Sequence, residues 1–217
     1  MSLIDQWIAW LPQLSPGLLV SLALTGLCLL FGMPLGLLLA LMIEGKIVPL
    51  RALALVLVEI GRGAPALVLL YLLYFGLPEG GVVLPAFTTG VISLSWTTGA
   101  YSSELFRAGL AAVPRGQREA AVTSGLRGWN GFRHIIFPQA IRISTPPLAS
   151  LAVTIFQTSS LAFVIAVPEL MSKAYQLGSI SFEYLSIFCL TAVLYGAITI
   201  VALMVVRLGE RRLNRYL

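Results

Sequence analysis

Charged residues are scarce in this 217-residue sequence. They make up 11% of the chain, whereas 58% of the residues are hydrophobic. Soluble domains carry about 25% charged residues. The shortage excludes an ordinary soluble domain and indicates a chain that lies largely within lipid.

Residues and motifs on which enzymes depend are also few. The two cysteines, Cys28 and Cys189, fall in separate apolar stretches, so we interpret both as small core residues rather than a disulfide or metal site. The single histidine, His134, lies in a polar segment, which argues against an intramembrane enzyme. The pattern G-x-x-x-x-G-K-[ST] is absent from the sequence, so this chain does not hold ATP phosphates by that route. We expect no catalytic residue, metal or cofactor on this chain.

Long uncharged stretches fill most of the chain. Residues 18–43, 80–103, 143–167 and 186–206 each reach the roughly 20 apolar residues that cross a bilayer core. A fifth stretch, 52–77, is interrupted by Glu59 and Arg62. We therefore predict an all-α membrane protein with five transmembrane helices in one transmembrane domain, residues 1–217. The first stretch is too long for the core of a signal peptide, and is predicted to be a permanent span.

Basic residues are distributed unevenly between alternate sides of these five spans. One side holds twelve: Lys46, Arg51, Arg107, Arg115, Arg118, Arg127, Arg133, Arg142, Arg207, Arg211, Arg212 and Arg215. The other side holds one, Lys173. Because basic loops face the cytoplasm, we predict a periplasmic N-terminus and a cytoplasmic C-terminus. This distribution accounts for the net charge of +5 without a nucleic-acid partner.

Two predicted spans carry acidic and basic residues three positions apart, Glu59 with Arg62 and Glu104 with Arg107. Residues at that spacing share a helix face, so we predict two ion pairs, Glu59–Arg62 and Glu104–Arg107. Glycines and Pro65 next to Arg62 predict a break in the helix. Ionisable groups at membrane depth mark functional sites; the alternative is that both pairs are interfacial salt bridges.

The fourth span contains four consecutive polar residues, 157–160. Lipid does not satisfy such groups, so they face protein or a wet cavity, as in the substrate sites of transporters. The alternative is hydrogen bonding between helices. The candidate substrate-binding residues are Gln157, Thr158, Ser159 and Ser160 on this span, Thr98, Tyr101 and Ser102 on the third, and Arg62 on the second.

The longest predicted cytoplasmic loop spans about residues 107–142, and its middle part, about residues 112–138, is expected to form an amphipathic helix. Pro114 suits its first turn. Val122, Leu126 and Trp129 follow at i, i+4 and i+7, which is one apolar stripe. Such a helix fills a groove, either on the membrane surface or on a partner protein.

The same loop contains Glu119-Ala120-Ala121, three residues, Gly125, nine residues, Ile135, one residue and Phe137-Pro138. This pattern resembles the EAA loop of ABC importer permeases, in which Leu usually stands at the position of Phe137. Other stretches resemble the polar amino acid branch: Arg62-Gly63-Ala64-Pro65, Gly99-Ala100-Tyr101 with Glu104 and Arg107, Gly116-Gln117 and Pro138-Gln139-Ala140. The resemblance covers about residues 25–170.

This resemblance implies a type I importer transmembrane domain in a bacterial inner membrane, on a non-catalytic permease subunit. It implies two ABC ATPase subunits that bind ATP and Mg²⁺, a second permease, identical or paralogous, and a periplasmic or lipid-anchored solute-binding protein. The coupling residues it implies are Glu119, Ala120, Ala121, Gly125 and Pro138. The alternative is an ion-coupled secondary transporter that uses Glu59 and Glu104, although such carriers usually show internal repeats, and we find none in this sequence.

One departure from the branch concerns the substrate. The branch often has Lys-Asp-Thr-Ser-Leu where this chain has Gln157-Thr158-Ser159-Ser160-Leu161, so both charges are absent. A cationic side chain in low dielectric needs an opposite charge. We therefore predict a polar, non-cationic amino acid, with glutamate, aspartate or glutamine preferred.

Overall fold

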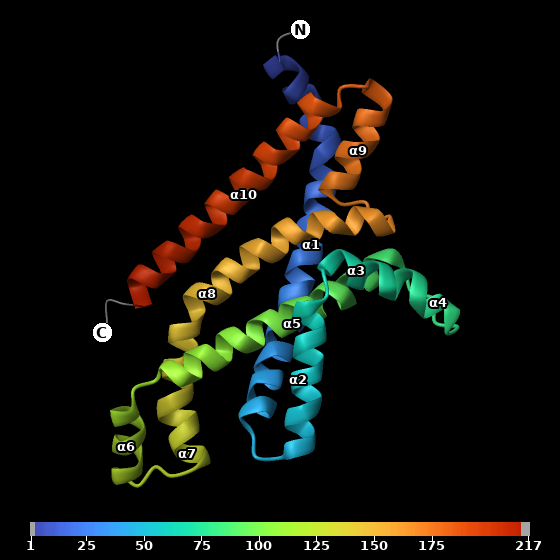
Figure 1. Ribbon diagram of the computed structural model, residues 1–217. Helices are drawn as coiled ribbons and strands as arrows, with labels where there is room; N and C mark the ends of the chain where they lie inside the picture. The colour runs from blue at the N-terminus through green and yellow to red at the C-terminus, as the bar shows by residue number, and fades with distance from the viewer. Residues whose placement is uncertain (1–2, 214–217) are drawn as a thin grey trace.

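The computed structural model describes residues 3–213, and within that range it is helical with no strand (Figure 1). The α-helices are α1 (Leu3–Glu44), α2 (Val48–Gly63), α3 (Ala66–Tyr71), α4 (Leu77–Glu79), α5 (Ala86–Ala112), α6 (Arg115–Thr123), α7 (Trp129–Gly131), α8 (Phe137–Thr158), α9 (Leu170–Ser181) and α10 (Tyr184–Leu213). The π-helical turns η1 (Leu72–Gly76) and η2 (Phe132–Ile136) and the 3₁₀ helix η3 (Ser159–Ile165) connect some of them. The all-α prediction is confirmed. Of the basic residues used for topology, Arg215 lies outside the described residues, as do the side chains of Arg207, Arg211 and Arg212.

Among the described residues, three continuous helical segments are long and apolar enough to cross a membrane: Leu3–Glu44, Trp129–Ile165 and Tyr184–Val206. A fourth is obtained if Val48–Gly63 and Ala66–Glu79 count as one span, although these are bent by 107°. The break predicted at Pro65 is therefore present, and it is sharper than a kink. Helix α5 is not among the four, so the count of five spans and the sidedness of the termini stay predictions.

Helix α5 lies at the centre of the molecule, against α1, α2, α3 and α8 (Figure 1). It begins at Ala86 and continues to Ala112, whereas the sequence predicted a span over residues 80–103. Many of its buried residues are serines and threonines, among them Thr98, whose hydroxyl donates to the carbonyl oxygen of Leu94 at 2.6 Å. Protein rather than lipid covers this polar helix, which is why its apolar character is weaker than that of the other long helices.

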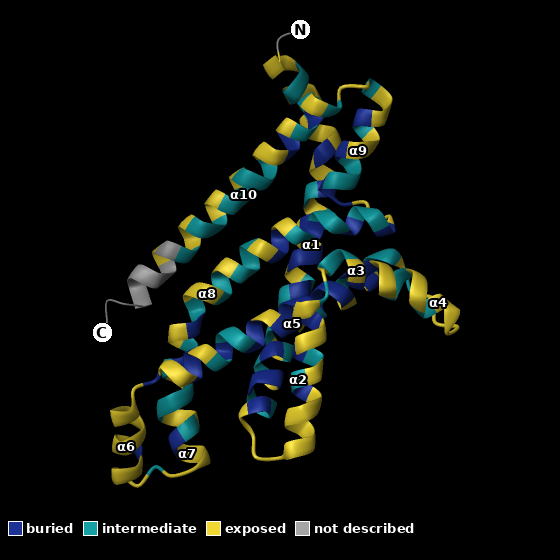
Figure 2. Ribbon diagram, in the orientation of Figure 1, coloured by how far each residue is buried: buried dark blue, intermediate teal, exposed yellow. Residues whose placement is uncertain are grey.

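Helices α1 and α5 approach closely because α1 carries glycines at the contact. A Cβ atom on Gly36 would collide with the Ser102 hydroxyl, and one on Gly32 would lie 2.5 Å from Thr98 Cβ. A buried apolar cluster lies nearby, and Figure 2 shows buried residues gathered where these helices cross. Cys28 belongs to this cluster, whereas Cys189 is exposed, so the predicted core role applies to Cys28 alone.

The ends of the molecule differ in their loops. The α1–α2 turn, α6 and α7 lie at one end, and the N-terminal part of α1, α9 and the start of α10 lie at the other (Figure 1). The predicted basic loops are thus gathered at one end. Helix α9, which the sequence analysis missed, begins at Leu170. Its N-cap is Glu169, whose side chain accepts hydrogen bonds from the backbone N–H groups of Met171 and Ser172.

Candidate functional site

A cavity of about 440 Å³ lies beside the break between α2 and α3. Its lining residues are Arg62, Gly63, Ala64, Pro65, Ala66, Thr97, Tyr101, Leu151, Thr154, Ile155 and Thr158. They come from the break, from α5 and from α8. Small-molecule sites in proteins fall in this range of volumes.

The local sequence explains why the chain opens at this point. Ala64 precedes a proline, which disfavours helical dihedral angles, and its backbone is extended at φ −83° and ψ 135°. Helix α2 therefore ends at Gly63, and a new helix continues from Ala66 to Glu79. Residues 62–66, which include this break, line one part of the cavity.

Three of the eight predicted substrate-binding residues line this cavity: Arg62, Tyr101 and Thr158. Thr98 and Ser102 do not, since both are fully buried at the contact with α1. The prediction that Thr98 and Ser102 bind the substrate is therefore corrected. Thr98 lies one residue after Thr97, and consecutive helical residues point about 100° apart. Thr97 and Tyr101, which both line the cavity, are four positions apart on α5. Residues at that spacing share a helix face, so the prediction of Tyr101 could have pointed to Thr97 instead of Thr98.

The polar run at residues 157–160 does not face one site as predicted. The Gln157 amide donates to the Thr199 hydroxyl of α10 at 3.5 Å. Ser159 is buried, and its hydroxyl donates to the Phe156 carbonyl oxygen. Ser160 donates to the carbonyl oxygen of Gln157. Thr158 faces the cavity together with Thr154, one turn earlier, which the sequence analysis missed.

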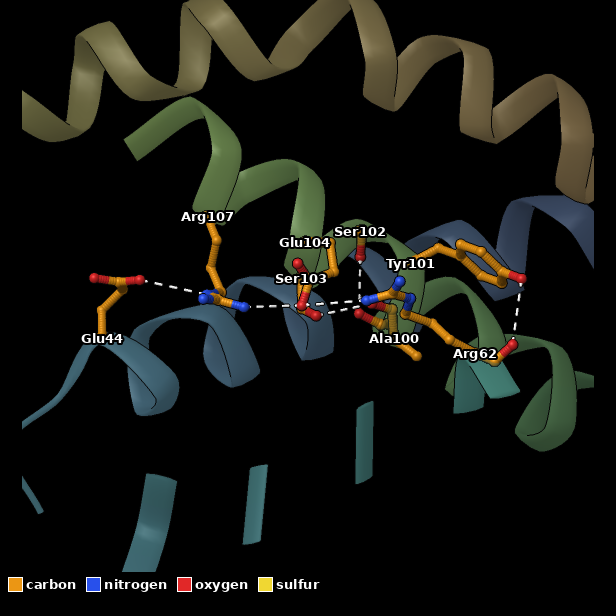
Figure 3. A network of polar contacts seen from close by, with 9 residues as sticks. Glu44, Arg62, Ala100, Tyr101, Ser102, Ser103, Glu104 and Arg107 are labelled. Carbon is orange, nitrogen blue, oxygen red and sulfur yellow. Dashed lines mark hydrogen bonds and ion pairs between the residues drawn. The ribbon is translucent and has the colours of Figure 1, made fainter. Parts of the chain in front are cut away.

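An ion-pair network joins the cavity to the rest of α5 (Figure 3). Arg62 Nη1 lies 3.4 Å from Glu104 Oε1, and Arg107 Nη1 lies 2.9 Å from the same oxygen atom. Arg107 Nε lies 3.3 Å from Glu44 Oε1 at the end of α1. The predicted Glu104–Arg107 pair is thus present, with two further partners.

The predicted Glu59–Arg62 pair is not formed. Arg62 lies in the last turn of α2 and pairs with α5 instead. Glu59 is exposed, and no ion pair of Glu59 occurs within the described part of the chain. Spacing along α2 identified Glu59 as a possible partner of Arg62, but it did not reveal that Glu104 on the neighbouring helix α5 lies closer.

The predicted coupling loop contains a helix that is shorter than expected. Helix α6 ends at Thr123, and Gly125, at φ +80°, closes it with a Schellman motif. The Leu126 N–H bonds the Ala121 carbonyl oxygen, and the Gly125 N–H bonds that of Val122. The stripe of Val122, Leu126 and Trp129 therefore does not lie along one helix, because the positive φ of the glycine reverses the chain direction.

Figure 2 shows α6 exposed along most of its length. Glu119 and Ala120 are exposed, whereas Ala121 is buried. The Arg118 guanidinium donates to the Leu110 carbonyl oxygen at 2.6 Å, which fixes α6 to the end of α5. Pro138 is exposed in the first turn of α8.

Similar proteins were found by sequence and by structure. Residues 32–215 match the family described as "Binding-protein-dependent transport system inner membrane component". The chain is similar to "Probable amino-acid ABC transporter permease protein YckA" of Bacillus subtilis (strain 168), with 36% identity over 94% of this chain and 91% of the relative. It is also similar to "L-cystine transport system permease protein TcyB" of the same organism, with 38% identity over 94% and 88% of the two chains.

A solved structure described as "Crystal structure of an amino acid ABC transporter with histidines" has a TM-score of 0.92 to this chain. The two are 33% identical, and the match covers 98% of this chain and 99% of the other. Such agreement supports the type I importer arrangement of helices that the EAA loop implies. The chain therefore belongs to the family of inner membrane components of binding-protein-dependent transport systems.

Proposed function

We propose that this chain is the permease subunit of an ATP-driven ABC importer for a polar, non-cationic amino acid, with glutamate, aspartate or glutamine preferred. That the substrate is an amino acid is supported by the similarity to permeases described as transporting amino acids or L-cystine and to the solved amino acid transporter. Membership of a binding-protein-dependent family speaks against the ion-coupled secondary carrier that the sequence left open.

The composition of the cavity carries the proposal for the substrate. Among the described residues that line it, Arg62 is the only charged one, and four others have hydroxyl groups: Thr97, Tyr101, Thr154 and Thr158. The helix that starts at Ala66 also presents its positive end to the cavity. These groups suit a carboxylate together with an amide or acidic side chain. A cationic side chain would face Arg62 with no carboxylate among the lining residues.

The energy source is proposed to be ATP bound with Mg²⁺ on two partner ATPases. The exposed helix α6, with Glu119, Ala120 and Ala121 followed by Gly125, would dock on them, and Pro138 would hold the start of α8. A second permease, identical or paralogous, and an external solute-binding protein complete the proposed importer. ATP and substrate then bias the same two states, facing inward or outward.

Competitive uptake into proteoliposomes that contain this permease, its ATPase and its binding protein tests the proposal. Glutamate, aspartate or glutamine should compete best. A clear preference for arginine, lysine or histidine would overturn the specificity.

A charge placed in the cavity gives a sharper test. Thr158→Asp should strengthen binding of radiolabelled arginine relative to glutamine by about tenfold, since a charge-assisted hydrogen bond contributes about 1.5–3 kcal/mol. The assay is equilibrium binding to the purified permease–ATPase complex, without the binding protein. Gln157→Asp is the control, because Gln157 bonds α10 and does not line the cavity. Equal effects of the two variants would contradict this location of the site.

A further inference from the structure

Glu104 occupies an unusual electrostatic position at the edge of the cavity. One of its carboxylate oxygens, Oε1, contacts two guanidinium groups, those of Arg62 and Arg107 (Figure 3). Arg107 has a second acidic partner, Glu44. For Arg62, Glu104 is the only acidic partner among the described residues. The charge of Arg62 is therefore neutralised by the carboxylate of Glu104, which Arg62 shares with Arg107.

The two contacts of Glu104 Oε1 differ in length. The contact from Arg107 is a hydrogen bond of 2.9 Å, whereas Arg62 lies at 3.4 Å. The side chains of Arg62 and Glu104 are 37% and 34% exposed. An ion pair that is long and open to water costs little to separate. Glu104 would keep its stronger partner if Arg62 turned to another carboxylate.

We propose that Glu104 is the resident counter-ion of Arg62 and that the α-carboxylate of the substrate takes its place during transport. The exchange replaces one carboxylate by another, so the charge around Arg62 is conserved. Arg107, held by Glu44, retains Glu104 beside the site. When Glu104 returns to Arg62 it competes with the substrate and helps its release. Glu104 is then a positioning residue. This inference rests on the proposed function only in requiring that the cavity take an amino acid.

The proposal predicts opposite changes in affinity and turnover. Glu104→Gln leaves Arg62 without its competitor, so the complex should bind radiolabelled glutamine about threefold more tightly, the range expected for an exposed ion pair. Release should slow, and turnover in proteoliposomes with ATP inside should fall by a similar factor. A merely structural role would lower turnover without tighter binding.

The matched control is Glu59→Gln. It removes a carboxylate three residues from Arg62 on the same helix, where no ion pair is formed, and should change neither quantity. Tighter binding in both variants would show a general effect of charge and overturn the exchange. Unchanged or weaker binding in Glu104→Gln would overturn it as well.

A charge swap keeps the test valid if Glu104→Gln assembles poorly. The double variant Arg62→Glu with Glu104→Arg keeps opposite charges at positions 62 and 104, and Arg107, which loses its partner at position 104, keeps Glu44. The cavity then has a carboxylate in place of its guanidinium, so the assembled variant, isolated by gel filtration, should fail to bind glutamine. Restored binding and turnover would show that the pair has only a structural role and would overturn the proposal.

If the wild type binds arginine instead, the proposed specificity fails while the same variants test the exchange with arginine. If it binds no amino acid, both proposals are overturned.

Discussion

Glu169 joins three helices through one buried carboxylate. Besides the two backbone N–H groups of its own helix, it accepts hydrogen bonds from the Ser21 hydroxyl of α1 at 3.2 Å and the Tyr195 hydroxyl of α10 at 3.0 Å. Its side chain is fully buried. The residue therefore caps α9 and fixes that helix against the first and last helices of the chain.

Stability should depend on pH through this residue. Burial raises the pKa of the Glu169 carboxyl, and the hydrogen bonds from Met171, Ser172, Tyr195 and Ser21 offset only part of that rise. Because the folded pKa exceeds the unfolded one, the contribution is fully present at low pH and is lost as pH rises through the interval between the two values. Glu169→Gln, which does not titrate, should flatten this slope in thermal unfolding of the detergent-solubilised protein. Parallel slopes for the two proteins would contradict the assignment.

Glycines on α1 differ in what surrounds them, which gives a matched pair of variants. Gly36→Ala places a methyl group against Ser102 and should destabilise the protein by about 1–3 kcal/mol, the usual cost of overpacking. Gly26→Ala meets no atom within 4 Å in this chain and should be neutral in the isolated permease. Thermal unfolding measures both. Equal losses would show that the cost arises from the α1 backbone rather than from the contact with α5.

At the scale of elements, the coupling loop depends on the backbone of one glycine. Gly125 has φ +80°, and a Cβ atom at this position would meet nothing within 4 Å of this chain. A side chain here is thus disfavoured by conformation, not by crowding within the subunit. The Schellman turn directs the chain from α6 back toward α7 and so sets how α6 is presented.

Two substitutions separate the backbone effect from contact with a partner. Gly125→Leu should uncouple ATPase activity from substrate in the reconstituted importer. Gly125→Asn should retain much more coupling, since asparagine tolerates positive φ. The measurement is ATP hydrolysis with and without substrate-loaded binding protein. If asparagine fails as completely as leucine, close approach of the ATPase to this glycine is the better explanation, and unchanged uptake in Gly125→Leu would count against the loop altogether.

The sequence predicted structural features that depend on a residue's own backbone preference, and it missed those that depend on tertiary contacts or on an unusual backbone conformation. The break at Pro65 was predictable because proline and glycine act on their own backbone. The apolar stripe of the coupling loop was wrong because Gly125 adopts positive φ, which no periodicity reports. In the candidate site, Tyr101 and Thr158 were predicted from residue type. Thr154 and Thr97 were missed because the sequence does not show how α8 and α5 are rotated about their axes, and that rotation decides which residues face the cavity. Arg62 was assigned to Glu59 because its true partner, Glu104, lies 42 positions away in sequence.

At the scale of the whole molecule, the cavity and the coupling loop are connected by α5 and α8. Helix α5 carries Thr97 and Tyr101 at the cavity and is held near its other end by Arg118 of α6. Helix α8 starts beside the loop and reaches the cavity at Thr154 and Thr158. If a partner displaced α6, as proposed above, the displacement would act on the two helices that line the cavity, which is what coupling of ATP to substrate access requires.

The same arrangement predicts transport without a proton gradient. Proton coupling needs a carboxylate that gains and loses a proton with substrate, and the two acids considered are poorly placed for it. Glu59 is exposed without an ion pair among the described residues, and Glu104 stays beside Arg107. In vesicles with constant internal ATP, the initial rate of amino acid uptake should survive a protonophore, and an imposed gradient without ATP should drive none. Loss of uptake on adding the protonophore at unchanged ATP would show that ion coupling contributes and would contradict this prediction.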